Sequence, residues 1–229
     1  IVGDMKNLIN PHFNDCYFSN ENGYLESRYV FIEGNEIELR DLNNICIGET
    51  GFGTGLNLLV LEDVLREKKS QLHITFTTIE KYPLAPEAVR NSINLLEQVS
   101  EKSLKYHMVL YNFIYENLID GWNSHTIKRE WGILNFNLFI GDVMDAFTTY
   151  PVKNMVWFLD GHSPDKNPEM WTVELFKKIG ENSAQNTSFS TFTAAGIVKQ
   201  GLRKAGFFVK RHKGFGSKRH MIKGTYLYH

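Results

Sequence analysis

The chain has 229 residues, of which 42% are hydrophobic and 13% aromatic, so it can bury the core of a folded domain. Charged residues make up 22% of it, which argues against a disordered protein, and no run of about 18 apolar residues predicts a membrane-spanning helix. The first residues lack the pattern of a secretory signal, and Cys16 and Cys46 stand alone, without the spacing of metal ligands. We therefore expect a cytoplasmic protein with reduced thiols.

The net charge of −1 conceals an uneven distribution along the chain. The last acidic residue is Glu181, and residues 182–229 carry nine Lys or Arg with no Asp or Glu. Residues 1–181 hold the other 16 basic residues and all 26 acidic ones. A basic segment of this length favours a polyanionic partner such as a nucleic acid. The alternative is a solvated face whose basic residues lie beside acidic neighbours from the first part of the chain.

Short strands are expected near the start of the chain, and strands that alternate with helices follow from residue 45. Residues 17–40 contain two apolar runs around a hairpin-like turn at 33–36, which predicts a small N-terminal β extension within residues 1–44. Residues 104–132 predict a helix followed by a loop. The other expected strands are 44–50, 73–80, 136–142, 154–161, 188–194, 207–213 and 220–228, and the other expected helices are 56–69, 86–102, 168–182 and 196–206.

This alternation predicts an α/β fold with a mostly parallel, seven-stranded sheet covered by helices on both faces. The last two strands, which flank "GFGSK", are expected to form an antiparallel hairpin. We expect a single domain in which residues 45–229 form a Rossmann-like core. Ligands of such folds bind at the carboxyl ends of the strands, so the residues that follow each strand are the candidates for a site.

Three glycines at alternate positions, Gly51, Gly53 and Gly55, follow Glu49 at the end of the first core strand. The dinucleotide motif G-x-G-x-x-G would need its third glycine where Leu56 stands, and no Lys-Ser or Lys-Thr pair of a phosphate-binding loop follows. The spacing is similar to the cofactor loop of class I S-adenosylmethionine-dependent methyltransferases. A tight strand-to-helix turn without a ligand is the alternative interpretation.

Acidic residues also end three later strands. Glu80 could accept hydrogen bonds from both hydroxyls of a ribose, or could be a solvated carboxylate. Asp142 could accept from the amine of an adenine, cap the next helix, or do both. Asp160 lies in a loop rich in Pro and Gly, where methyltransferases hold the atom to be methylated, although it could also be a turn carboxylate. His162 could act as a base, but a lone loop histidine is more often structural.

Six motifs in order then resemble one family. They are "FNDCYFSNENGYLESRYVF", "ETGFGTGLN", "EKYPL", "WFLDGHSPDKNPEMW", "TFTAAGIVKQGLRKAGF" and "KGFGSKRHM", and they span nearly the whole chain. The chain resembles the methyltransferase domains, including stand-alone forms, of bacterial bifunctional tRNA 5-methylaminomethyl-2-thiouridine biosynthesis proteins. Two positions depart from that pattern, because His162 replaces the usual Phe and His220 replaces the usual Glu.

The resemblance implies methylation, with S-adenosylmethionine, of 5-aminomethyl(-2-thio)uridine at the tRNA wobble position. It implies that Glu49, Gly51, Gly53 and Gly55 contact the methionine part of the cofactor, Glu80 the ribose and Asp142 the adenine. Asp160 would lie beside the target amine. A flavin-dependent oxidase, in another domain or another protein, would remove a carboxymethyl group beforehand, and neither FAD nor a metal ion is expected in this chain.

Contacts with the anticodon arm of tRNA are expected from the remaining motif residues. Basic residues would hold phosphates, and Trp171 or Phe215 could stack on the uridine that is splayed out of the anticodon. The expected tRNA contacts are Lys166, Asn167, Trp171, Lys213, Phe215, Lys218 and Arg219. Two other functions stay open: a methyltransferase or aminopropyltransferase that acts on a small amine, and an inactive RNA-binding module.

Overall fold

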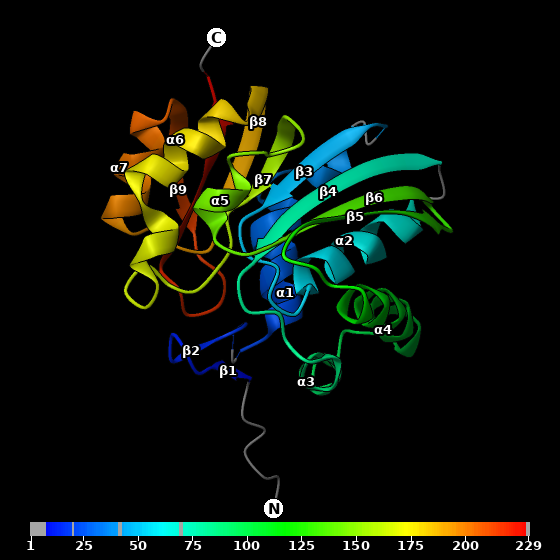
Figure 1. Cartoon of the computed structure of the whole chain (residues 1–229). Coiled ribbons are helices and arrows are strands. Elements are labelled where there is room, and N and C mark those ends of the chain that lie inside the picture. Colours follow the sequence, from blue (N-terminus) through cyan, green and yellow to red (C-terminus); the bar gives the residue numbers. More distant parts are fainter. Residues whose placement is uncertain (1–7, 20, 41–42, 69–70, 228–229) are drawn as a thin grey trace, which may run out of the picture.

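The computed structural model describes residues 8–19, 21–40, 43–68 and 71–227, and a twisted sheet lies at its centre (Figure 1). Eight strands pair in the order β5-β6-β4-β3-β7-β8-β10-β9. The five from β6 to β8 run parallel, whereas β5 and β10 are antiparallel to their neighbours. The strands are β3 (Ile45–Glu49), β4 (Leu72–Glu80), β5 (Gly121–Arg129), β6 (Gly132–Ile140), β7 (Asn154–Phe158), β8 (Ser183–Thr191), β9 (Phe207–Lys213) and β10 (His220–Tyr226).

Helices cover both faces of this sheet (Figure 1). The helices after residue 44 are α2 (Leu56–Glu67), α3 (Pro86–Ile93), α4 (Glu101–Glu116), α5 (Val143–Ala146), α6 (Val173–Glu181) and α7 (Gly196–Lys204), with a 3-10 turn, η3, at Pro168–Trp171. One apolar cluster joins α2, α3 and α4 to the sheet around Phe76 and Phe136, and a second joins α5, α6 and α7 to it around Trp157 and Phe189. Because both faces are buried, β3, β6 and β7 are apolar along most of their length, whereas β4 and β8 also carry buried Thr or Ser.

The alternation of strands and helices and the antiparallel pairing of β9 with β10 confirm the predicted α/β fold. The sheet has eight strands rather than seven, because β5 occupies part of residues 104–132, where a loop was expected after the helix. β5 lies at the edge of the sheet, and its Ser124, Thr126 and Lys128 are exposed. An edge strand with one polar face lacks the continuous apolar run that marks the central strands.

The prediction of strands over residues 17–40 is wrong. Their described part forms α1 (Gly23–Ser27), a π-helix η1 (Arg28–Glu33) and a 3-10 turn η2 (Ile37–Leu39). The two short strands that pair in the N-terminal segment, β1 (Ile9–Asn10) and β2 (Asp15–Cys16), lie before residue 17. The side chain of Asn22 caps α1 by accepting a hydrogen bond from the Leu25 amide. Residues 1–7, 20 and 41–42 of the predicted extension, and the ends of the segments predicted at 56–69 and 220–228, lie outside the described residues.

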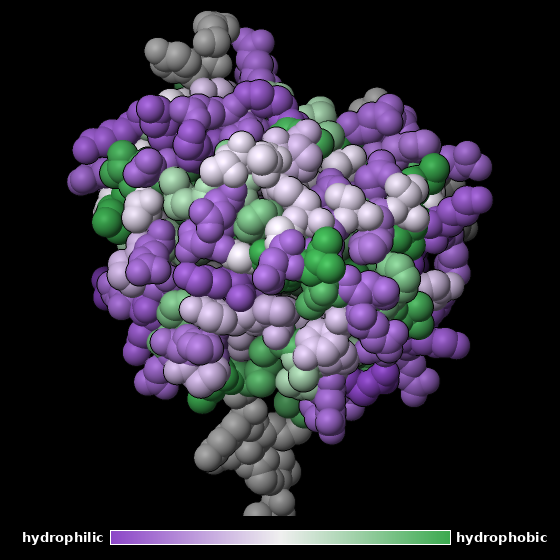
Figure 2. Space-filling view, viewed as in Figure 1, coloured by the Kyte–Doolittle hydropathy of each residue, from purple (hydrophilic) through white to green (hydrophobic). Residues whose placement is uncertain are grey.

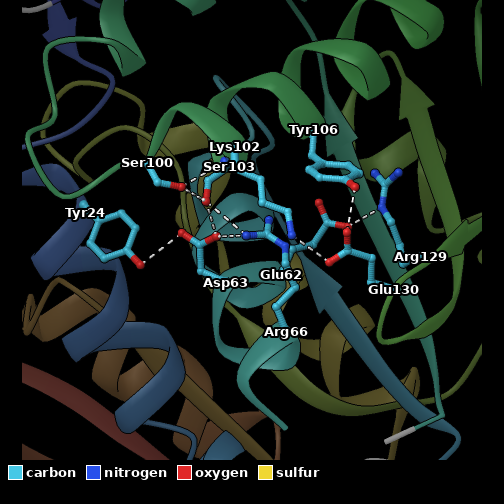
Figure 3. Close-up of polar contacts among 10 residues, drawn as sticks. All are labelled: Tyr24, Glu62, Asp63, Arg66, Ser100, Lys102, Ser103, Tyr106, Arg129 and Glu130. Atoms are coloured by element: carbon cyan, nitrogen blue, oxygen red, sulfur yellow. Dashed lines mark hydrogen bonds and ion pairs between the residues drawn. The ribbon is translucent and has the colours of Figure 1, made fainter. Parts of the chain in front are cut away.

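A polar network fixes α2 against its neighbours (Figure 3). Asp63 on α2 accepts hydrogen bonds from Tyr24 on α1 at 3.1 Å and from Ser103 on α4 at 2.6 Å, and it pairs with Arg66. The buried pair of Glu62 and Arg129 ties α2 to β5. α2 begins directly after the glycine-rich loop, so this network also holds the helix that carries the end of that loop.

Hydrophilic side chains make up most of the face seen in Figure 2, and hydrophobic ones appear there as separate small patches. This distribution agrees with the enclosure of the apolar strands between two layers of helices. No helix among the described residues combines the length and the apolar character needed to cross a membrane.

Candidate active site

A cavity of about 880 Å³ opens at the carboxyl ends of the central strands. Loops that follow β3, β4, β6 and β7 line it, together with residues of the N-terminal segment from Asn10 to Phe31 and the loop between β9 and β10. The strand order reverses between β3 and β7, which is where ligands of open α/β sheets bind. The volume lies within the range of about 300–1,000 Å³ that is usual for small-molecule sites.

The three loop glycines serve different local needs. Gly53 and Gly55 have positive φ angles of 54° and 71°, which other residues rarely adopt. A Cβ on Gly51 would lie 3.2 Å from the carbonyl oxygen of Asp160, and one on Gly55 would lie 2.7 Å from the His107 ring. Gly51 and Gly53 line the cavity, whereas Gly55 is not among the described residues that line it. The close approach of the two loops therefore leaves little room for a side chain at Gly51, and the turn into α2 requires Gly55.

Glu80 ends β4 with both carboxylate oxygens in use. Its Oε2 accepts a hydrogen bond from the Gly53 amide at 2.7 Å, and its Oε1 accepts one from the Tyr82 amide at 2.7 Å. Burial raises the pKa of Glu80 against the effect of these bonds. The Lys81 amide also hydrogen-bonds this carboxylate, which lines the cavity and keeps acceptor capacity for a ribose hydroxyl. The residues present therefore fit a nucleoside at this position.

Asp142 follows β6 and caps α5, as one of the two interpretations predicted. Its Oδ1 accepts from the Met144 amide at 3.0 Å, and its Oδ2 pairs with Lys81 at 3.0 Å. Partial burial acts to raise the pKa of Asp142, but the Met144 amide and Lys81 outweigh it and lower the pKa. The side chain also lines the cavity, so capping and contact with an adenine are compatible.

Asp160 lies in the cavity wall directly after β7. Its Oδ2 accepts a hydrogen bond from the side-chain amide of Asn57 at 2.6 Å, and its Oδ1 accepts one from the Gly161 amide at 2.9 Å. Burial raises the pKa of the carboxyl to about 6 against the effect of these bonds. The group is therefore mostly ionised at neutral pH and titrates close to it, which suits a group that accepts a proton.

Glu49 lies below the cavity floor rather than in it. It is 1% exposed, and its two oxygens accept from Thr78 at 2.6 Å and from Asn57 at 2.9 Å. Burial raises its pKa well above the ordinary value. Glu49 is absent from the described lining residues, so its predicted contact with the methionine part of the cofactor stays a prediction.

The residues predicted to contact tRNA lie in three environments. Asn167 and Lys218 line the cavity, and Lys218 pairs with Glu26 of α1 at 2.6 Å. Trp171 is 2% exposed, and its indole N–H donates to the carbonyl oxygen of His162 at 2.8 Å, so it supports the loop from beneath. The described lining does not include Lys166, Lys213, Phe215 or Arg219, and all but the half-buried Phe215 are exposed.

The N-terminal segment supplies part of the wall, which the sequence analysis did not foresee. The side-chain amide of Asn10 donates to Nε2 of His162 at 2.9 Å, and the rings of Phe13 and Tyr17 lie 4.9 and 5.2 Å from the His162 ring. Burial lowers the pKa of His162, while the nearby Asp15 acts in the opposite direction. Position 162, where the chain departs from the resembled family, therefore lies in the cavity wall.

Asn57 and Glu26 were also missed, although both lie in quoted motifs. Asn57 interrupts the apolar start of α2, between the buried Leu56 and Leu58, and such a lone polar residue is the signal that could have marked it. Glu26 was hidden by the incorrect assignment of its segment as a strand.

Comparisons with known proteins agree with this geometry. A family model described as an S-adenosyl-L-methionine-dependent methyltransferase matches residues 105–227. Proteins named "tRNA 5-methylaminomethyl-2-thiouridine biosynthesis bifunctional protein MnmC" are similar to the chain: that of Marinomonas sp. is 39% identical over 93% of this chain, and that of Vibrio campbellii 36% over 95%. The chain spans about a third of the length of these relatives, 32% and 33%.

A solved structure shares the fold. The crystal structure of MNMC2 from Aquifex aeolicus superimposes with a TM-score of 0.72 at 24% identity, over 94% of this chain and 65% of the other. This likeness confirms the architecture of the sheet and its closing hairpin. Because the family model covers more than half of the sequence, the chain belongs to the family of S-adenosyl-L-methionine-dependent methyltransferases.

Proposed function

We propose that the chain methylates the aminomethyl nitrogen of 5-aminomethyl(-2-thio)uridine at the wobble position of tRNA, which yields 5-methylaminomethyl(-2-thio)uridine. The observation that carries the proposal is the carboxyl of Asp160, which lines the same cavity as Glu80 and Asp142. The printed names of relatives that are 36–39% identical over nearly the whole chain support this substrate.

The proposal assigns the cofactor to the part of the cavity formed by the strand ends. S-adenosylmethionine supplies a methyl group on a positively charged sulfur. Glu80 would hold the ribose hydroxyls, and Asp142 would accept from the adenine amine. The backbone of Gly51 and Gly53 would lie along the methionine part, because these two glycines line the cavity.

Asp160 would act on the target amine. An alkyl amine has a pKa of about 10 and is mostly protonated at neutral pH, and it cannot attack a methyl group in that form. The ionised Asp160 would accept a hydrogen bond from the amine, orient the nitrogen lone pair along the line of attack, and accept the released proton. A carboxyl with a pKa of about 6 is mostly ionised at pH 7, as acceptance of a proton from the amine requires.

The N-terminal segment would form the tRNA side of the cavity. A wobble uridine must leave the anticodon stack to reach Asp160, and flipped bases stack on aromatic side chains. Phe13 and Tyr17 offer rings in the cavity wall, whereas Trp171 is buried. We therefore propose that Phe13 and Tyr17, rather than Trp171, receive the base.

The basic C-terminal segment would bind the phosphates of the anticodon arm. Two of its nine basic residues pair with acids of the N-terminal segment, Lys218 with Glu26 and Lys223 with Glu36. No ion pair is found for the other seven within the described ranges: Lys199, Arg203, Lys204, Lys210, Arg211, Lys213 and Arg219. Such residues release counterions when they bind phosphates, so tRNA binding should weaken steeply with salt.

An oxidase would have to supply the aminomethyl group. The relatives are named bifunctional and are about three times as long as this chain, so we propose that a flavin-dependent oxidase, in the same polypeptide or in another protein, acts first. We also propose that the described residues form one methyltransferase domain. The expected cytoplasmic location stays a prediction.

Methyl transfer to tRNA that carries 5-aminomethyl-2-thiouridine tests the proposal. The purified chain should convert this nucleoside to its methylaminomethyl form, detected by mass spectrometry of digested tRNA, and Asp160→Asn should not. Absence of transfer by a protein that binds S-adenosylmethionine in calorimetry would contradict the substrate. Undiminished activity on a free amine at high salt would instead favour a small-amine transferase.

A further inference from the structure

One side-chain amide, that of Asn57, contacts two carboxylates. Its Nδ2 donates to Oδ2 of Asp160 at 2.6 Å and to Oε1 of Glu49 at 2.9 Å. Its Oδ1 accepts from the hydroxyl of Ser27 on α1 at 2.5 Å. An amide nitrogen has two hydrogens, so both donors of Asn57 are directed at carboxylates. The residue is 6% exposed and lines the cavity, and these bonds leave its amide a single orientation.

The two carboxylates differ in their surroundings. Glu49 is 1% exposed and its other oxygen contacts the hydroxyl of Thr78, whereas Asp160 faces the cavity. Burial is the main cause that raises the pKa of Glu49 well above its ordinary value, and the neighbouring Asp160 adds to the rise. The shared amide therefore joins a carboxyl in the core to one that faces the cavity.

The other charged groups near Asp160 are few. Glu26 of α1 raises the pKa of Asp160, and Lys218 of the loop between β9 and β10 lowers it, while these two residues also pair with each other at 2.6 Å. Glu49 approaches from β3 through Asn57. Apart from the Gly161 amide, Asn57 is the neutral group whose hydrogen bond holds the carboxylate.

We propose that Asn57 is a positioning residue for methyl transfer, which fixes the Asp160 carboxylate toward the cavity and stabilises its ionised form, with Ser27 holding the amide in the required orientation. This inference rests on the proposed function, because it concerns the group that receives the target amine. It explains why a polar residue occupies the second position of α2, whose first six residues are otherwise apolar.

Asn35 shows what a purely structural asparagine looks like in the same protein. It is 1% exposed, and its amide donates to the Ser190 hydroxyl at 2.5 Å and to the Phe31 carbonyl at 3.1 Å. Its Oδ1 accepts from the Ser188 hydroxyl at 2.6 Å. The two asparagines are matched in residue type and burial, and the amide of Asn35 also donates to the Trp157 carbonyl at 3.4 Å, so Asn35 makes four side-chain bonds and Asn57 three. They differ in their partners, which are neutral for Asn35 and two carboxylates for Asn57.

A titration of the Asp160 carboxyl carbon by ¹³C NMR tests the proposal without substrate, with Asp160→Asn to assign the signal. The midpoint should rise by about one pH unit in Asn57→Ala, because the ionised Asp160 carboxylate loses a hydrogen bond of the usual strength for a charged acceptor. Ser27→Ala should raise it by less. Asn35→Ala should leave the midpoint unchanged even if it lowers the melting temperature.

Single-turnover methyl transfer should follow the same shift. Below pH 6 the rate of Asn57→Ala should fall about tenfold relative to the native protein, and the deficit should shrink as the pH rises and Asp160 ionises. A deficit that does not depend on pH, with an unshifted midpoint, would overturn the proposal and leave Asn57 a structural residue. If Asn57→Ala does not fold, Ser27→Ala decides, and an unshifted midpoint there would overturn the role of Ser27 and Asn57.

Failure of this inference is distinguishable from failure of the proposed function. Suppose that the native protein methylates the modified tRNA and that the Asp160 carboxyl titrates with the same midpoint in Asn57→Ala as in the native protein. The role of Asn57 is then wrong, whereas the proposed function stands. If the native protein transfers no methyl group to that tRNA, the proposed function fails whatever the titration shows.

Discussion

The cavity has two sides of different origin. The strand ends contribute Glu80, Asp142 and Asp160, whose places follow from the order of strands in the sheet. The N-terminal segment contributes Asn10 and Glu26, which contact His162 and Lys218, residues more than 140 positions away. In the function that we propose, the strand ends provide the cofactor side, whereas contacts between residues far apart in the sequence provide much of the substrate side. Variants on the two sides should therefore fail in different ways.

The largest effect is expected for Asp160→Ala, which removes the group placed beside the target amine. Methyl transfer should fall by about a thousandfold or more, which is typical for loss of an acid–base residue, while cofactor affinity should stay within about tenfold. Single-turnover rates and calorimetry with S-adenosylmethionine measure the two quantities. Loss of both together would make Asp160 a structural residue instead.

Glu80→Gln should weaken the cofactor side. The amide lacks the second carboxylate oxygen, so one bond from a ribose hydroxyl or from the backbone is lost, and cofactor affinity should fall about tenfold or more. Calorimetry measures the change. Glu38→Gln, at a residue whose side chain pairs with Arg28, is the matched control and should bind the cofactor normally. If Glu80→Gln binds S-adenosylmethionine with unchanged affinity, the ribose does not bind at Glu80.

Asn10→Ala should affect the substrate side alone. The change removes the donor to His162 and to the Tyr17 hydroxyl, so the β1–β2 hairpin should be held less firmly against the Asp160 loop, where the bond from the Ser163 amide to Asp15 remains. We expect a several-fold rise of KM for tRNA without a change of cofactor affinity. Asn117→Ala, at the end of α4, is the control. A parallel loss of cofactor affinity would show that the two sides are not separable.

The smallest effect per residue is expected for the exposed basic side chains. Lys213→Gln and Arg219→Gln should each weaken tRNA binding a few-fold at physiological salt. The slope of log K against log salt should decrease by about 1 for each contact that is lost. Binding measured at several salt concentrations gives this slope, and Lys102→Gln on α4 serves as the control. An unchanged slope would place the anticodon arm elsewhere.

The sequence analysis located the strand ends correctly, because alternating strands and helices bring the carboxyl ends of parallel strands to one edge. It could not show which atoms of the glycine-rich loop face inward. Gly55 and Glu49 belong to the same motif as Gly51, yet Gly55 packs against His107 and Glu49 lies in the core. That difference depends on backbone angles and on packing partners from α4, which the motif does not encode.

The N-terminal segment was mispredicted for a related reason. Val30, Phe31 and Ile32 are all buried, and three consecutive buried apolar residues are as typical of a central strand as of an enclosed helix. Here the segment packs between the sheet and α2, so tertiary contacts decide in favour of a helix. β5 was missed for the opposite reason, since its outward residues are polar.

Both regions nearest the chain ends meet over the cavity. Glu21 accepts from the Ser217 amide, Lys218 pairs with Glu26, and Tyr29 donates to the Lys213 carbonyl. Synthesis runs from the N-terminus, so Gly51, Glu80 and Asp160 are made before the residues of β9 and of the loop after it that these contacts join. The wall over the cavity is therefore complete only after the loop between β9 and β10 has been made.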